Sequence, residues 1–100
     1  MSYSFLAPAR SELEEAVGFY DSRQEGLGDE FAAEAQAAIA RILHNPYAWP
    51  KVSEGVRRCR LRRFPYGLVY QVRPNGLLIV AVMHLRRNPF YWRDRVRPKG

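Results

Sequence analysis

The chain has 100 residues, of which 47% are hydrophobic and 13% aromatic, so it is long enough for one domain with a packed core and is not a disordered chain. Its single cysteine, Cys59, excludes an intrachain disulfide and fits a reducing compartment. The net charge of +6 is unevenly distributed, because residues 1–50 carry −5 and residues 51–100 carry +11. The basic half predicts an anionic partner, either a polyanion or an acidic protein.

The first half of the chain predicts one strand and two helices. Residues 3–6 alternate as a short strand would. A helix is expected to start at Pro8, or alternatively at the capping box SELE that begins with Ser11. The glycines of the stretch 26–28 end this helix, and a second, alanine-rich helix runs to Asn45, which precedes a proline. We therefore expect a helical hairpin with a short turn.

The second half predicts a loop, three strands and a short tail. The loop covers residues 47–55, and the strands are expected at residues 56–63, 67–73 and 77–84. The turn signal PNG joins the last two strands as a hairpin. The order indicates one α+β domain over residues 1–100: an N-terminal strand, a helical hairpin, a three-stranded antiparallel meander in one twisted sheet, and a C-terminal tail.

Five arginines crowd the stretch VRRCRLRR at the start of this meander. Alternate side chains of a strand share a face, so Arg58, Arg60 and Arg62 form one row. Cys59 and Leu61 lie on the other face and are expected to contact the helices. The helical hairpin covers that face and leaves the arginine row on an open one. This row predicts binding of an anionic partner, and protection of an exposed strand edge is a compatible alternative.

The stretches GLGDEF, NPYAWP, FPYGLVY and HLRRNPFYW resemble motifs of the RelE/ParE superfamily, the toxins of bacterial toxin–antitoxin pairs. The resemblance covers nearly the whole chain and is closer to the ParE-like branch, because the sheet lacks the lysines typical of RelE-like nucleases. It implies a twisted antiparallel sheet and a cognate antitoxin that wraps the toxin and neutralises it. It also implies that sequence-specific DNA binding belongs to the antitoxin, and it leaves a co-repressor role for this chain open.

The resemblance implies three functions, which remain open at this point. ParE-like members inhibit DNA gyrase and are not nucleases, and this is the favoured expectation. RelE-like members cleave mRNA on the ribosome, in which case the chain is a metal-independent endoribonuclease. The third alternative is an inactive module that retains only antitoxin binding.

The candidate site residues follow from these functions. The residues expected to bind the target or RNA are Arg58, Arg60, Arg62, Arg86 and Arg87. In a nuclease, Arg60 or Arg62 would stabilise the phosphate, and His84 or Tyr91 would transfer protons. Both proton-transfer candidates also have a structural interpretation. His84 would be a structural histidine at the end of a strand, and Tyr91 would be an aromatic residue that packs the tail onto the sheet.

Several kinds of site are not expected. The two histidines and one cysteine lack the spacing of a metal site, and no glycine-rich phosphate loop is present, so we expect neither a metal nor a cofactor. No stretch resembles a signal peptide, and the longest apolar run, residues 77–83, is too short to span a bilayer. We therefore expect a cytoplasmic protein that does not bind membranes.

Overall fold

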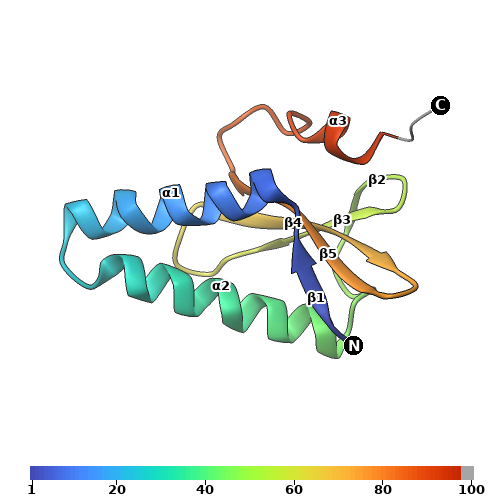
Figure 1. Ribbon diagram of the computed structural model, residues 1–100, viewed down its shortest axis with the longest axis horizontal. Coiled ribbons are helices and arrows are strands. Elements are labelled where there is room, and N and C mark those ends of the chain that lie inside the picture. Colours follow the sequence, from blue (N-terminus) through green and yellow to red (C-terminus); the bar gives the residue numbers. More distant parts are fainter. Residues whose placement is uncertain (98–100) are drawn as a thin grey trace.

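The computed structural model describes residues 1–97 and confirms the α+β order of helices and strands (Figure 1). In chain order these are β1 (Tyr3–Phe5), α1 (Ala7–Arg23), α2 (Leu27–His44), β2 (Lys51–Ser53), β3 (Val56–Arg60), β4 (Tyr66–Arg73), β5 (Gly76–His84) and α3 (Arg93–Val96). The first helix begins one residue before Pro8, so the capping box at Ser11 lies inside it. Among the described residues, no helix combines the length and the apolar character needed to cross a membrane.

The strands form one sheet with the order β1-β5-β4-β3-β2. Strands β2 to β5 make an antiparallel meander, whereas β1 pairs with β5 in parallel. The meander therefore has four strands instead of the three predicted. Strand β2 was expected to be loop because its three residues are too few to show an alternating pattern. Gly55, with a φ of 70°, allows the tight turn that pairs β2 with β3.

The turn of the helical hairpin depends on two glycines. Gly26 adopts a left-handed conformation with a φ of 87°, which side chains disfavour. Its amide donates a hydrogen bond of 3.0 Å to Oδ1 of Asp21. A Cβ on Gly28 would overlap the backbone oxygen of Val17, so the two helices approach closely at this point. The stretch GLG thus provides both the turn and the close contact.

The main core lies between the hairpin and one face of the sheet, which we call the hairpin face. Its largest fully buried members include Phe31, Ile39, Ile42, Leu68 and Tyr70. Cys59 is also fully buried here, which confirms that this side of β3 faces the helices. The burial of this apolar surface provides most of the driving force for folding.

The opposite face of the sheet is not open, contrary to the prediction. The C-terminal segment, residues 85–97, returns from the end of β5 across the sheet (Figure 1). Its Trp92 is fully buried in a second apolar cluster with Val56, Val69, Val80 and Met83. We call this side the tail face. The sheet therefore has apolar residues on both faces, each covered by a different part of the chain.

A β-bulge decides which side chains the end of β5 presents to each face. Val69 of β4 pairs with Ala81, but the next residue, Tyr70, pairs with Ile79. Val80 is thus an extra residue on β5, and both Val80 and Ala81 lie in the tail-face cluster. From this bulge onward, the side chains of β5 occupy the face opposite to that given by strict alternation.

Candidate functional site

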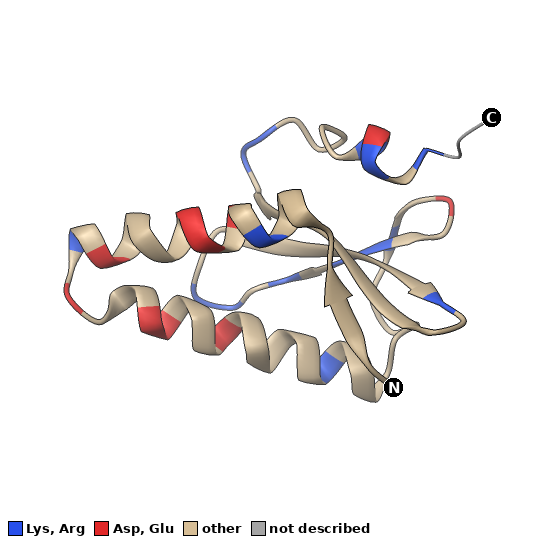
Figure 2. Cartoon of the chain, in the orientation of Figure 1, with Lys and Arg blue, Asp and Glu red and all other residues tan. Residues whose placement is uncertain are grey.

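The predicted arginine row is divided by the end of β3. Arg58 and Arg60 follow Val56 on the tail face, but the strand ends at Arg60, so Arg62 lies in the loop to β4. The expected strand 56–63 is therefore three residues too long. Arg60 and Arg62 are exposed and Arg58 is half-buried. Figure 2 shows basic residues on β3, on the loop after it and on the C-terminal segment, and acidic residues mainly on the two helices.

Acidic side chains of α2 hold the loop that carries Arg62. The amides of Arg62 and Arg63 both donate hydrogen bonds to Oε2 of Glu34, the second at 2.9 Å. The Arg63 guanidinium also pairs with Glu30 at 2.7 Å. Because Glu34 binds the backbone, the exposed Arg62 side chain forms no ion pair with any of residues 1–97 and can reach a partner.

Arg58 is less exposed than Arg60 and Arg62, the other two arginines of the predicted row. Burial lowers the pKa of its guanidinium, and the positive charge of Arg60 lowers that pKa further. Its aliphatic stem lies against Gly67 of β4. Arg58 and Arg60 are thus neighbours of like charge on the tail face.

His84 does not share the face of Arg58 and Arg60. Its ring contacts Tyr66 edge-on, with centroids 5.1 Å apart, and Tyr66 packs against Phe31 of the hairpin. The one-residue shift at the bulge turns His84 to this side. A nuclease site would need His84 beside Arg60, and the structure does not bring these two residues together. The Nδ1 atom of His84 accepts a hydrogen bond of 3.1 Å from the amide of Arg86.

His84 lines a cleft of about 350 Å³ between α1 and the end of β5. The cleft is lined by Glu12, Glu15, Ala16, Phe19, Tyr66, Val82, His84 and Arg87. Burial raises the pKa of Tyr66, and the neighbouring Tyr20 and acidic side chains raise it further. The cleft thus combines acidic, basic and aromatic groups.

Glu12 is the residue in this region that sequence reasoning missed. Its side chain is only 12% exposed and accepts hydrogen bonds at both oxygens. Oε1 accepts from the amide of Val82 at 3.1 Å and from Arg95 at 2.9 Å. Oε2 accepts from the hydroxyl of Tyr91 at 2.7 Å and from Arg95 at 3.0 Å. Burial acts to raise the pKa of Glu12, but these hydrogen bonds and the charge of Arg95 lower it overall.

These contacts replace the backbone partners that a neighbouring strand would provide. Strand β1 pairs with only three residues of β5, ending at Ile79. Beyond that point Glu12 accepts from the amide of Val82, and Arg95 donates to the carbonyl of Val80 at 3.1 Å. No sequence signal distinguishes Glu12 from Glu14, which is exposed on the same helix.

Tyr91 and Arg87 belong to the same network. The Arg87 guanidinium stacks on the ring of Tyr91, 3.6 Å from its centroid, and lies 3.4 Å from Oε2 of Glu12. Burial raises the pKa of Tyr91 strongly, and its hydrogen bond to Glu12 raises it further. Together with the burial of Trp92, these contacts confirm that the aromatic residues pack the tail onto the sheet.

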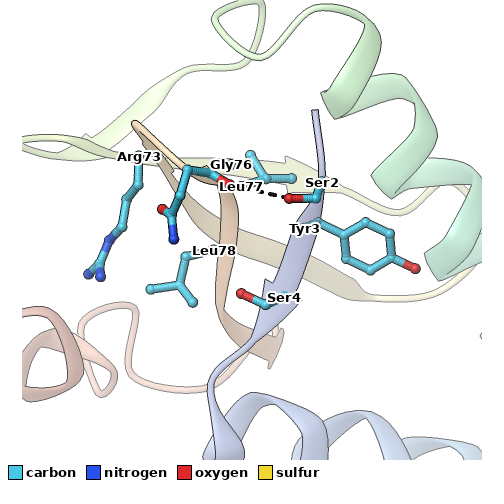
Figure 3. Close-up of a pocket in the computed structure, with 8 residues that line it drawn as sticks. Ser2, Tyr3, Ser4, Arg73, Gly76, Leu77 and Leu78 are labelled. Carbon is cyan, nitrogen blue, oxygen red and sulfur yellow. Dashed lines mark hydrogen bonds between the residues drawn. The ribbon is translucent and has the colours of Figure 1, made fainter.

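A separate pocket of about 260 Å³ lies at the other end of the sheet (Figure 3). Ser2, Ser4 and Arg73 contribute polar groups to it, and the Ser2 hydroxyl donates a hydrogen bond of 3.2 Å to the carbonyl of Asn75. None of the predicted site residues lines this pocket. Within residues 1–97, no group of three or more His, Cys, Asp or Glu side chains is arranged to hold a metal ion.

Comparison with known proteins identifies the family of the chain. The family model described as the ParE toxin of the type II toxin–antitoxin system parDE matches residues 3–89. A solved structure described as the chromosomal ParDE TA system from P. aeruginosa is similar, with a TM-score of 0.65 and 18% identity over 86% of this chain and 97% of that chain. That likeness shows the fold. No curated protein sequence matches the chain. Because the family model spans most of the sequence, the chain belongs to the ParE toxin family of type II toxin–antitoxin systems.

Proposed function

We propose that this toxin inhibits bacterial growth by binding DNA gyrase, and that a cognate antitoxin neutralises it in the cytoplasm. Membership of the ParE toxin family supports a toxin paired with an antitoxin. The observation that carries the choice of mechanism is the separation of Arg60, a candidate phosphate-binding arginine, from His84, a candidate proton-transfer group. It favours a toxin that acts by binding a protein over one that cleaves RNA.

RNA cleavage requires a phosphate-stabilising cation and a proton-transfer group at one phosphodiester. Arg60 lies on the tail face of β3, whereas His84 contacts Tyr66 on the hairpin face. The Tyr91 hydroxyl donates a hydrogen bond to Glu12, and its raised pKa makes it a poor acid or base near neutral pH. Arg60 and His84 therefore do not meet at one phosphodiester, and Arg87, the cation that does line the cleft of His84, is engaged by Glu12, which supports the gyrase proposal.

The exposed arginines around the end of β3 offer a surface for the target. Arg60, Arg62 and Arg86 are exposed, and within residues 1–97 none of their guanidinium groups pairs with a carboxylate. Arg87 is partly engaged by Glu12, although its side chain remains 54% exposed. Guanidinium groups bind carboxylates in bidentate geometry, so this surface suits an acidic patch of a protein.

The proposal is tested by inducing the toxin in a bacterium without its antitoxin and following thymidine and amino-acid incorporation in parallel. DNA synthesis is expected to fail first, and purified toxin is expected to inhibit supercoiling by gyrase holoenzyme. Protein synthesis failing first would overturn the proposal in favour of mRNA cleavage. If neither fails, the chain is an inactive antitoxin-binding module.

The surface assignment has its own variant test. Replacing Arg60 and Arg62 together by Ala should abolish toxicity without unfolding the chain, because both side chains are exposed and Glu34 holds only the backbone of Arg62. Arg73→Ala removes an exposed arginine at the opposite end of the sheet and serves as the control. Full toxicity of the double variant would show that the target binds elsewhere.

A further inference from the structure

The stem of Arg58 lies over a glycine of the neighbouring strand. Arg60 pairs directly with Gly67, and Arg58 pairs with Val69, so Arg58 and Gly67 are diagonal neighbours on the tail face. A Cβ on Gly67 would lie 3.0 Å from Cγ of Arg58 and 3.1 Å from its Cδ. Any side chain at this position would push the stem aside. On its other side the same position is bounded by Leu85, with Cδ2 at 3.5 Å.

The Arg58 guanidinium lies on the tail face without a carboxylate partner among residues 1–97. Within the described part of the chain, neither Arg58 nor Arg60 pairs with a carboxylate. Each of the two guanidinium groups repels the other, and half-burial makes the charge of Arg58 less favourable still. An arrangement that holds two such charges together without neutralising them is stabilised when an anionic group binds between them.

We propose that Gly67 is a positioning residue of the target-binding surface. Because Gly67 has no side chain, the stem of Arg58 can lie over it, and Arg58 and Arg60 then bind a carboxylate of the protein target together. The inference rests on the proposed function, because it takes these arginines to contact the target. A carboxylate is favoured over a phosphate because Leu85 adds apolar surface beside Gly67, and apolar surface suits a protein interface.

The test compares Gly67→Ala and Gly67→Val with the unchanged toxin for growth inhibition, gyrase inhibition and thermal unfolding. Val suits a strand better than glycine does, Ala lowers the backbone entropy lost on folding, and the neighbour that must move is a flexible arginine stem, so the melting temperature is expected to hold or rise. Growth inhibition and affinity for gyrase holoenzyme should fall by about tenfold for Val, the loss of roughly one charge-assisted hydrogen bond, and by less for Ala. If Gly67 had only a structural role, its replacement would lower the melting temperature and the toxicity together.

A double-variant cycle assigns the effect to Arg58. In the Arg58→Ala background the stem is gone, so adding Gly67→Val should cause no further loss of toxicity. Gly18→Ala is the matched control, because a Cβ there meets no atom within 4 Å. Full toxicity of Gly67→Val, or an equal loss in both backgrounds, would overturn the inference.

Two further outcomes separate this inference from the proposed function. If the unchanged toxin stops growth but leaves gyrase active, the gyrase proposal fails, while the growth data of the cycle still decide the role of Gly67. A DNA duplex bound by the toxin alone, with the same dependence on Gly67, would overturn the carboxylate as ligand and replace it with a phosphate.

Discussion

Glu12 and Arg95 form a bidentate ion pair that connects the first helix to the C-terminal segment, with N–O distances of 2.9 and 3.0 Å. Residues 83 positions apart in sequence meet at the edge of β5 where β1 has ended. The pair also binds the amide of Val82 and the carbonyl of Val80. It therefore completes the edge of the sheet and fastens the segment that covers the tail face.

Removing the Glu12 carboxylate is expected to destabilise the fold markedly. Glu12→Ala leaves the Tyr91 hydroxyl and an amide of β5 without their acceptor and leaves Arg95 without its counter-charge, which we expect to cost about 3 kcal/mol of unfolding free energy. Urea unfolding followed by circular dichroism measures this cost. Glu14→Ala is the control, because Glu14 is exposed on the same helix and should change stability by less than about 0.5 kcal/mol. Equal costs for the two variants would contradict the role of the pair.

The same carboxylate predicts a dependence of stability on pH. The pKa of Glu12 is lower in the folded chain than its ordinary value of 4.5. Its contribution to stability is thus fully present above that value and is lost as the pH falls through the folded-state pKa. The difference in unfolding free energy between the unchanged chain and Glu12→Gln should therefore shrink as the pH is lowered from 6 toward 3. A difference that stays constant over this range would contradict the prediction.

Trp92 allows packing and hydrogen bonding to be separated. Trp92→Ala removes the largest fully buried side chain and should cost about 3–5 kcal/mol. The buried indole N–H has no partner within the described residues, so Trp92→Phe loses no hydrogen bond and should cost about 1.5 kcal/mol or less. Thermal unfolding of both variants tests this. Equal losses would show that the indole nitrogen binds a group that stabilises the fold.

The two glycines at positions 18 and 28 should respond to alanine in opposite directions. Gly28→Ala places a Cβ against the backbone oxygen of Val17 and should destabilise the hairpin by about 1–3 kcal/mol. Gly18→Ala meets open space on α1 and should stabilise the chain by about 0.5–1 kcal/mol. The free energy of unfolding of each variant decides the matter. A stabilising Gly28→Ala would show that the helices are less closely packed than described.

The order of helices and strands follows from local properties of the sequence. Alanine-rich and amphipathic stretches form the hairpin, Gly26 provides its turn and Gly28 its close contact, and the PNG turn joins β4 to β5. Cys59 was correctly placed on the helix side of β3, because alternation within one regular strand depends only on neighbouring residues. The family resemblance likewise depended on short motifs and was confirmed over residues 3–89.

The arrangement of the candidate site was decided by tertiary structure. The bulge at Val80 turns His84 away from Arg58, and the fold of residues 85–97 covers the face expected to be open. The partnership of Glu12 and Arg95 depends on β1 ending at Phe5, which leaves backbone groups of β5 for side chains to satisfy. A bulge, a closing segment and a long-range ion pair each depend on residues far apart in the chain. Local sequence patterns therefore determined which helices and strands form, and the contacts between them determined which side chains meet.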